Sequence, residues 1–224
     1  MTTGSARSLY PVSSSVRVWL GKLDRDRVGS FLQQEAIAAI VDASHPYAVE
    51  ISRLSVETAR KYNLPYLRYE RPAVELPPGV VRRSSVEDLL GGSDLDGERV
   101  LLTIGYRFLA QFRSYHDRAV LFARILPSIV ALNAAIEAGF GNDRIIALRP
   151  PVSAALETAL WQQWQISTVV TKASGRAGGE DVKYTVAQKL GVKLVVLDRP
   201  TCHYPQQTES LETAIAFCQS LRSN

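Results

Sequence analysis

The chain has 224 residues, enough for one large α/β domain or two small ones. Its 46% hydrophobic and 21% charged residues are typical of a globular protein with a substantial core. A net charge of +4 is too small and too dispersed to indicate nucleic-acid binding, but it suits an enzyme with anionic ligands. We find no secretory signal and no apolar run near the ~20 residues of a membrane span, so we expect a cytoplasmic protein with no membrane partner. Both cysteines, Cys202 and Cys218, are expected to be free thiols.

Strand and helix patterns alternate along the chain, which predicts right-handed crossovers and parallel sheets. Strands are expected at residues 16–20, 37–41, 64–69, 100–104, 119–123, 144–148, 168–171 and 194–197. Helices are expected from the N-cap Asp24 to Glu35, from just after Pro46 to about Tyr62, and at residues 107–115, 128–138, 153–165, 180–190 and 209–221.

A cluster of turn-forming residues marks the best linker candidate, because Pro72, Pro77, Pro78 and Gly79 fall within eight residues. We therefore predict two doubly wound α/β domains, at residues 1–78 and 79–224. The first would have only about three strands, and none follows a Gly-rich strand-to-helix turn. We expect this domain to be incomplete at its N-terminus, since three strands alone would expose an edge and much apolar surface.

A compact polar turn, Asp42-Ala43-Ser44-His45-Pro46-Tyr47, joins the predicted strand at 37–41 to the next helix. In open parallel sheets, ligands bind at the carboxyl ends of the strands. Asp42, Ser44 and His45 place an acid, a hydroxyl and an imidazole at such an end. Asp42 and Ser44 could instead fix the turn and cap the helix. The clustering of the three side chains favours a functional site.

A second polar stretch, residues 171–180, also follows a predicted strand and precedes a helix. Its backbone could curl around an anion, with candidate binding residues at Lys172, Ser174, Gly175, Gly178, Gly179 and Lys183. Against this, Glu180 and Asp181 already occupy the first turn of the helix and satisfy its dipole. The spacing matches neither a P-loop nor G-x-G-x-x-G, so a plain flexible turn is the alternative.

Two further strand ends carry weaker signals. Tyr106, after Thr103-Ile104-Gly105, and Ser153, after Arg149-Pro150-Pro151-Val152, could approach a ligand, or could merely turn the chain and cap a helix. His116 and His203 have no partners at metal-ligand spacing, so we expect no metal site.

Five short motifs occur along the chain in an order and spacing that one enzyme family shares. They are Asp42-Ala43-Ser44-His45-Pro46-Tyr47-Ala48 with Ile51-Ser52, Leu67-Arg68-Tyr69-Glu70-Arg71-Pro72, Ala123-Arg124-Ile125-Leu126-Pro127, the Lys172 to Lys183 stretch as K-x-S-G-x-x-G-G-x-x-x-K, and Asp198-Arg199-Pro200. From about Thr2 to its C-terminus, the chain resembles the precorrin-6A and cobalt-precorrin-6A reductases of cobalamin biosynthesis.

This resemblance implies two Rossmann-like domains that use NADPH to reduce one carbon–carbon double bond of an anionic tetrapyrrole, with or without cobalt. Arg68, Arg71 and Arg124, all near predicted strand ends, would hold the carboxylates of the tetrapyrrole. A structural salt bridge is the alternative for each arginine. His45, oriented or charged by Asp42, would supply the proton, unless solvent or a substrate carboxyl does so and His45 only fixes the turn.

Two departures from the family pattern concern the ligand sites. Family members normally begin with a strand and a G-G-T-x-E turn, and we expect this chain to start near their second strand. Pro150 stands where the family has the glycine of a G-P-F-S turn. Because of these departures, the alternative to an active reductase is a truncated, non-catalytic protein that binds a tetrapyrrole or a nucleotide. A nucleotide-dependent transferase is a third possibility, because fold alone does not fix chemistry. We expect a monomer or small homo-oligomer.

Overall fold

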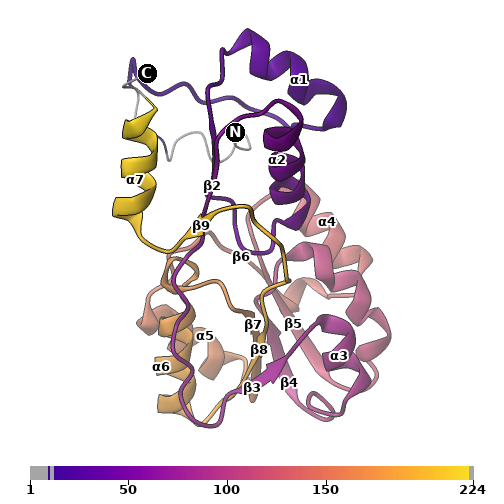
Figure 1. The fold of residues 1–224 in the computed structure, drawn as a ribbon. Helices are drawn as coiled ribbons and strands as arrows, with labels where there is room; N and C mark the ends of the chain where they lie inside the picture. The colour runs from indigo at the N-terminus through magenta and orange to yellow at the C-terminus, as the bar shows by residue number, and fades with distance from the viewer. Residues whose placement is uncertain (1–9, 11–12, 222–224) are drawn as a thin grey trace. The chain divides into compact units, whose positions relative to one another are not determined.

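The computed structural model describes residues 10 and 13–221. The chain forms two compact units, Met1–Glu70 with Cys202–Asn224, and Arg71–Thr201 (Figure 1). Both contain parallel sheets with helices, so the predicted α/β fold class is confirmed. The division differs from the expected domains, 1–78 and 79–224, because the chain returns to the first unit after Thr201.

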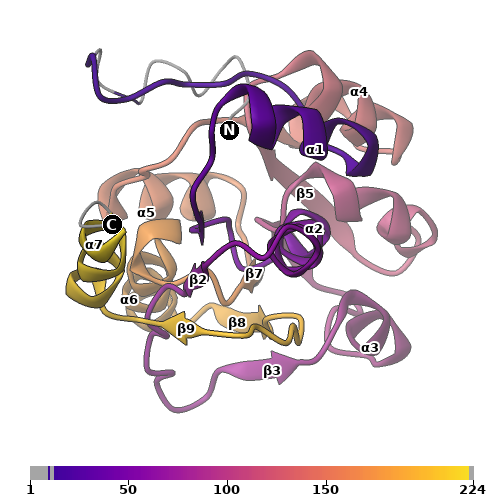
Figure 2. The same ribbon diagram turned by 45° about the horizontal axis from the view of Figure 1, so that its top comes forward.

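The first unit is built on a small parallel sheet in the order β1-β2-β9. Its elements are α1 (Arg25–Gln34), β1 (Ile40–Asp42), α2 (Val49–Lys61), β2 (Tyr66–Tyr69), β9 (Gln207–Thr208) and α7 (Leu211–Ser220). Helices α2 and α7 lie on either side of β2 (Figure 1), and β9 lies beside β2 (Figure 2). The register places Asp42 opposite Arg68 and Arg68 opposite Gln207.

The expected strand at residues 16–20 is wrong, because this segment belongs to neither sheet. Val16 makes an isolated bridge to Ser13. The side chains of Val16 and Leu20 are 42% and 39% exposed. Apolar residues alone therefore do not form a strand, which also needs a neighbouring strand to pair with its backbone groups.

The second unit has a six-stranded, all-parallel sheet in the order β3-β8-β7-β4-β5-β6. Its elements are β3 (Val81–Arg83), α3 (Val86–Gly91), β4 (Arg99–Leu102), the 3-10 helix η2 (Tyr106–Tyr115), β5 (Val120–Ile125), α4 (Ile129–Glu137), η3 (Asn142–Arg144), β6 (Ile145–Ala147), α5 (Ala154–Gln163), β7 (Thr168–Lys172), η4 (Arg176–Gly178), α6 (Glu180–Leu190) and β8 (Lys193–Leu197). Strand β3 and helix α3 were not predicted.

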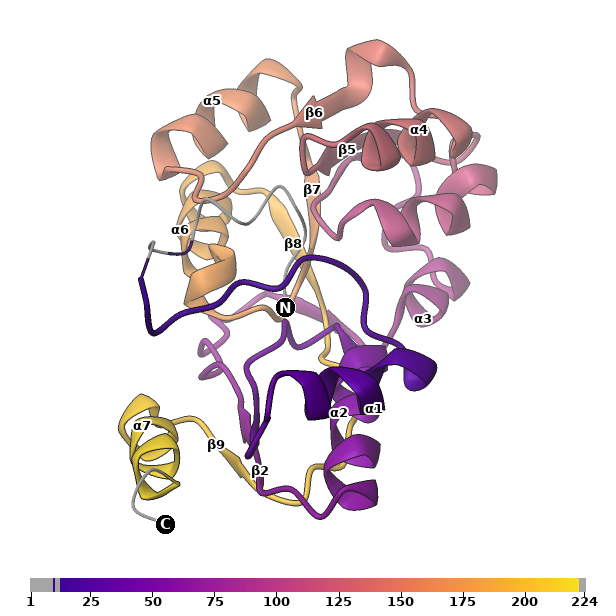
Figure 3. The same ribbon diagram turned by 90° about the horizontal axis from the view of Figure 1, so that it is seen from above.

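Helices cover both faces of this sheet. One buried cluster joins the strands to α3, η2 and α4, and the other joins them to α5 and α6. Figure 3 shows the two groups of helices on opposite sides of the strands. Val100, Leu101 and Leu102 are fully buried because a strand covered on both faces needs apolar side chains in both directions.

This winding fixes a switch point between β4 and β7. The chain leaves β4 through η2 toward β5, and it leaves β7 through α6 toward β8, on the opposite face. The two crossovers therefore diverge at the carboxyl ends of these neighbouring strands. Ligands of doubly wound sheets bind at such a switch point. Gly105 follows β4 here, and Lys172 ends β7.

Candidate functional site

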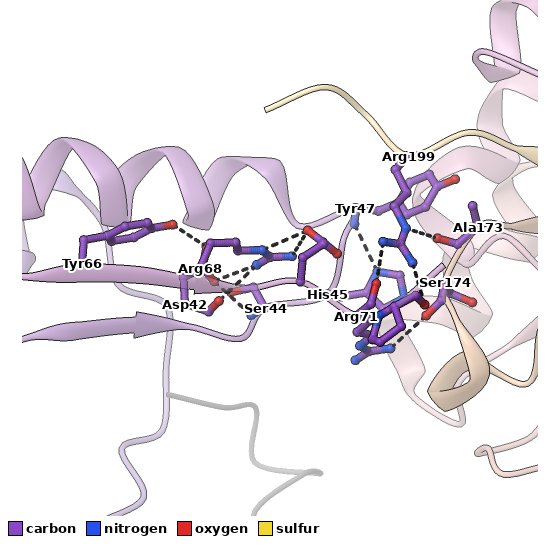
Figure 4. Close-up of polar contacts among 12 residues, drawn as sticks. Asp42, Ser44, His45, Tyr47, Tyr66, Arg68, Arg71, Ala173, Ser174 and Arg199 are labelled. Atoms are coloured by element: carbon purple, nitrogen blue, oxygen red, sulfur yellow. Dashed lines mark hydrogen bonds and ion pairs between the residues drawn. The ribbon is translucent and has the colours of Figure 1, made fainter. Parts of the chain in front are cut away.

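In the first unit, a buried ion-pair network joins the carboxyl ends of β1 and β2. Arg68 is 0% exposed, and its Nη1 lies 3.0 Å from Asp42 Oδ1 (Figure 4). Its Nε and Nη2 donate to Glu70 Oε2 at 3.0 Å and 2.9 Å. The Arg68 guanidinium lies 5.2 Å from the centre of the Tyr204 ring. Arg68 thus bridges two carboxylates, as the structural alternative predicts.

Asp42 is the centre of this network. Its Oδ1 accepts a hydrogen bond from the Ser44 N–H at 3.0 Å, and its Oδ2 accepts one from the Tyr66 hydroxyl at 3.2 Å. Burial by itself would raise the pKa of Asp42. Hydrogen bonds from Ser44 and Ser52 and the charge of Arg68 nevertheless hold this pKa below its usual value. Asp42 is therefore ionised at neutral pH and anchors the turn.

Sequence reasoning missed Tyr66 and Glu70. Because side chains alternate along a strand, Tyr66, Arg68 and Glu70 share one face of β2, and this period of two was the available signal. Burial and the nearby Asp42 carboxylate raise the pKa of the Tyr66 hydroxyl. The hydroxyl therefore stays protonated and donates to Asp42. Tyr204 lies in an irregular segment far along the chain, where no local pattern indicates its contact with Arg68.

His45 lies half-buried in the turn after β1. Its Nδ1 accepts a hydrogen bond from the Tyr47 N–H at 3.2 Å, and its carbonyl accepts one from the Ala48 N–H at 2.7 Å. An Nδ1 that accepts is unprotonated, so the neutral ring carries its proton on Nε2. The Asp42 carboxylate bonds to Ser44, Tyr66 and Arg68, which gives it partners other than His45. A role for Asp42 in orienting His45 stays a prediction.

A cavity of about 580 Å³ opens beside this turn within the first unit. Asp42, Ser44 and His45 line it together with apolar side chains of α1 and α2, among them Val28 and Leu54. The predicted cluster of acid, hydroxyl and imidazole therefore borders a real cavity, whose lining includes both polar and apolar side chains.

In the second unit, Lys172 lies at the switch point. Its Nζ is 4.8 Å from the centre of the Phe108 ring, and the backbone of Gly105 passes close to it. Gly105 has a φ of +84°, a conformation that favours glycine. Burial, and then the charge of Arg107, lower the pKa of Lys172 to about 8. Tyr106, the predicted residue beside Arg107, is half-buried at the start of η2. Lys172 is thus a candidate partner for an anion.

The loop that follows Lys172 is organised by its own side chains. The Gly175 N–H donates to Glu180 Oε2 at 2.7 Å, and the Tyr184 hydroxyl also donates to the Glu180 carboxylate. Lys183 Nζ donates to the carbonyls of Gly178 and Gly179 at 3.1 Å and 3.0 Å. Glu180 and Lys183 are 2% and 3% exposed. Lys183 therefore holds the loop together, and its expected contact with a ligand stays a prediction.

The remaining predicted residues have specific structural partners. Arg124 forms an ion pair with Glu157, which also accepts a hydrogen bond from Trp161 Nε1 at 3.0 Å. The side chains of Arg124 and Glu157 are 9% and 2% exposed, so a structural salt bridge is favoured for Arg124 as well. The Ser153 hydroxyl accepts from the Leu156 N–H at 3.2 Å and caps α5, which is the capping alternative.

Across residues 10 and 13–221, no group of three or more His, Cys, Asp and Glu side chains is arranged to hold a metal ion. In the same part of the chain, no helix is both long and apolar enough to span a bilayer. Cys202 and Cys218 are free cysteines.

The fold and the site define a doubly wound α/β protein with its candidate ligand residues at the carboxyl ends of parallel strands. The profile of the Precorrin-6x reductase CbiJ/CobK family matches residues 1–219. The chain therefore belongs to this family of reductases, which makes it an oxidoreductase of cobalamin biosynthesis.

Individual relatives agree with this assignment. The chain is 48% identical to a cobalt-precorrin-6A reductase of Synechocystis over 98% of its own length and 85% of the relative's. It is 33% identical to a cobalt-precorrin-6A reductase of Salmonella typhimurium, over 92% of this chain and 79% of the relative. A solved structure of the CobK precorrin-6A reductase is similar in fold, with a TM-score of 0.77 and 20% identity over 96% of this chain and 84% of that one.

Proposed function

We propose that the chain uses NADPH to reduce one carbon–carbon double bond of an anionic corrin-ring precursor, precorrin-6A or its cobalt form. The observation that carries this proposal is the 48% identity to a protein named cobalt-precorrin-6A reductase, over 98% of the chain. The protein would act in the cytoplasm as a monomer or small homo-oligomer. NADPH, when bound, would supply the hydride.

The residues at the switch point of the second unit fit an anionic ligand. Lys172 carries a positive charge below about pH 8, and Arg107 adds a second charge beside it. Gly105, with its φ of +84°, presents backbone without a side chain at the same place. A phosphate of the cofactor or a carboxylate of the tetrapyrrole would satisfy these groups. Tyr106 and the loop backbone at Ser174 and Gly175 would border the bound group.

Of the three candidate arginines, Arg71 is the one that we propose to bind the substrate carboxylates. Arg68 and Arg124 are buried and already paired with Asp42 and Glu157, so a substrate carboxylate would have to displace those partners. Arg71 is half-buried, and its Nη1 donates to the Ser174 carbonyl at 3.4 Å. The planar guanidinium group can bind a carboxylate with two parallel hydrogen bonds.

His45 is the proposed proton donor. Hydride addition to one carbon of the double bond leaves an electron pair that must take up a proton at the other end of the conjugated system. A neutral imidazole is a weak acid, so His45 would donate from its protonated form. Protonation of Nδ1 would break the bond that it accepts from the Tyr47 N–H. Proton donation by His45 would therefore be coupled to a change in the turn.

A turnover assay tests the proposal. The purified chain is mixed anaerobically with precorrin-6A or its cobalt form and with NADPH, and NADPH absorbance is followed together with the mass of the tetrapyrrole. We expect NADPH to be consumed while the tetrapyrrole gains two hydrogens, one of them deuterium when deuterated NADPH supplies the hydride. Tetrapyrrole binding without any mass gain would refute the proposal in favour of the non-catalytic binding protein.

A further inference from the structure

Arg199 ties together two segments of the second unit that are far apart in the sequence. Its Nε donates to the Ala173 carbonyl at 2.8 Å, in the loop after β7. Its Nη1 donates to the Arg71 carbonyl at 2.7 Å, and its Nη2 lies 3.5 Å from the Pro72 carbonyl, in the segment before β3. Figure 4 shows the guanidinium of Arg199 between Arg71 and Ala173.

The backbones of these two segments also touch directly. Gly175 has a φ of +75°, and a Cβ added to it would lie 3.0 Å from the Pro72 carbonyl oxygen and 3.6 Å from Arg199 Nη2. Any side chain at position 175 would push the loop away from the segment at 71–72. Arg71 adds a bond in the other direction, from its Nη1 to the Ser174 carbonyl at 3.4 Å.

The contacts of Arg199 depend on the shape of its guanidinium. Nε serves one segment while the two Nη atoms serve the other, and all three nitrogens lie in one rigid plane. A lysine at this position would keep the charge but could not serve both segments from one ammonium group. The Arg199 contacts fall on the turn directly after Lys172, where the Ser174 N–H donates back to the Lys172 carbonyl at 2.7 Å.

We propose that Arg199 is a positioning residue that fixes the turn after Lys172 and thereby sets the direction in which Lys172 meets its anionic ligand. This inference rests on the proposed ligand role of Lys172. The two neighbouring backbone segments, held by three carbonyl contacts, give Lys172 a fixed support at the end of β7. Arg199 itself touches neither ligand.

The test compares four variants of the full-length protein. Arg199→Lys keeps the charge but loses the planar guanidinium group. Gly175→Ala places a Cβ against the Pro72 carbonyl and so disturbs the contact between the same two segments. Arg82→Gln is the matched control, because Arg82 lines the same 680 Å³ cavity as Arg199 and pairs with Asp198 rather than with the three carbonyls. Lys172→Ala identifies the ligand that Lys172 binds. Each variant is measured by hydrogen exchange and by steady-state kinetics with both substrates.

We expect Arg199→Lys and Gly175→Ala to speed exchange of backbone amides at 71–76 and 173–175 but not in β5. Both should raise KM about tenfold or more for the one ligand that Lys172→Ala also weakens, with kcat/KM falling by up to about 100-fold, as a misplaced group can cause. Arg82→Gln should change neither property.

Two results would overturn the inference. One is faster exchange in Arg199→Lys with both KM values unchanged, because Arg199 would then support the loop without serving the reaction. The other is an equal loss in Arg82→Gln. The proposed role of Lys172 fails separately, if Lys172→Ala leaves both affinities unchanged, and the exchange data still report whether Arg199 holds the loop.

Discussion

Replacing Arg68 with methionine should destabilise the protein without selectively weakening either substrate. If Arg68 binds the tetrapyrrole carboxylates, its removal should raise KM for the tetrapyrrole. If Arg68 is instead the partner of buried carboxylates, its removal should lower the free energy of unfolding. The structure favours the second outcome, because the side chain is 0% exposed and contacts Asp42 at 3.0 Å and Glu70 at 2.9 Å.

The expected magnitude follows from what the substitution leaves behind. Methionine fills much of the space of the arginine stem, so the main cost is the Asp42 carboxylate, which is 3% exposed and would lose its positive partner. Removal of one partner from a buried ion pair costs about 3–5 kcal/mol. A globular protein has only about 5–15 kcal/mol of stability in total, so this loss is a large fraction.

Urea denaturation followed by far-UV circular dichroism measures this loss. Arg25→Met is the control, because Arg25 also pairs with a carboxylate, Glu57 at 2.8 Å, but its side chain is 77% exposed. We expect little change in that variant. The double variant Asp42→Asn, Arg68→Met should recover part of the stability, since it no longer buries an unpaired charge.

The opposite result would refute the assignment. If Arg68→Met unfolds at nearly the same urea concentration as the unchanged protein while its KM for the tetrapyrrole rises about tenfold, a change of 1.4 kcal/mol in binding, Arg68 is a substrate ligand. The contacts with Asp42 and Glu70 would then contribute little to stability.

Four further predictions concern other residues of the site. The stabilising contribution of the Asp42 carboxylate is fully present above its ordinary pKa of 3.8 and is lost as pH falls through the lower pKa of Asp42 in the folded protein. The melting temperature of Asp42→Asn should therefore depend less on acid pH than that of the unchanged protein. The same pH dependence in both proteins would contradict this. Binding of the anionic ligand should weaken as pH rises through about 8, where Lys172 loses its charge, and titration calorimetry should find no such loss in Lys172→Arg. His45→Asn should lower kcat by about 10²-fold with its melting temperature kept, whereas a normal kcat would make His45 part of the turn only. Arg124→Met should lower the melting temperature more than it raises KM, because Arg124 is 9% exposed and paired with Glu157; the reverse would restore it as a tetrapyrrole ligand.

Much of the strand and helix pattern of the second unit could be predicted, because buried elements have a recognisable local pattern of apolar residues. Strands such as β4 and β8 are covered on both faces and therefore read as continuous apolar runs. Helix α6 has the predicted bounds, Glu180–Leu190, and ends at Gly191, whose φ of +65° suits glycine as a C-cap.

Strands β3 and β9 could not be predicted in this way. β3 and β9 have three and two residues, too few to show a period, and each exists because a neighbouring strand pairs with it. β9 also explains why residues after Thr201 belong to the first unit, a long-range pairing that no local pattern near Gln207 indicates. The segment at 16–20 shows the converse, since its apolar residues have no partner strand among the described residues.

Sequence patterns alone showed where polar side chains follow strands, and so pointed to Asp42, His45 and Lys172. The contacts made by most of the charged residues became visible only in the folded protein. Arg68, Arg71 and Arg124 look alike in sequence, but Arg68 lies opposite Asp42 in the sheet register and Arg124 meets Glu157 of α5, whereas Arg71 joins the segment that Arg199 holds. The physical reason is that the role of a charge depends on its burial and on its distance from the opposite charge, and the fold sets both by bringing together residues far apart in the chain.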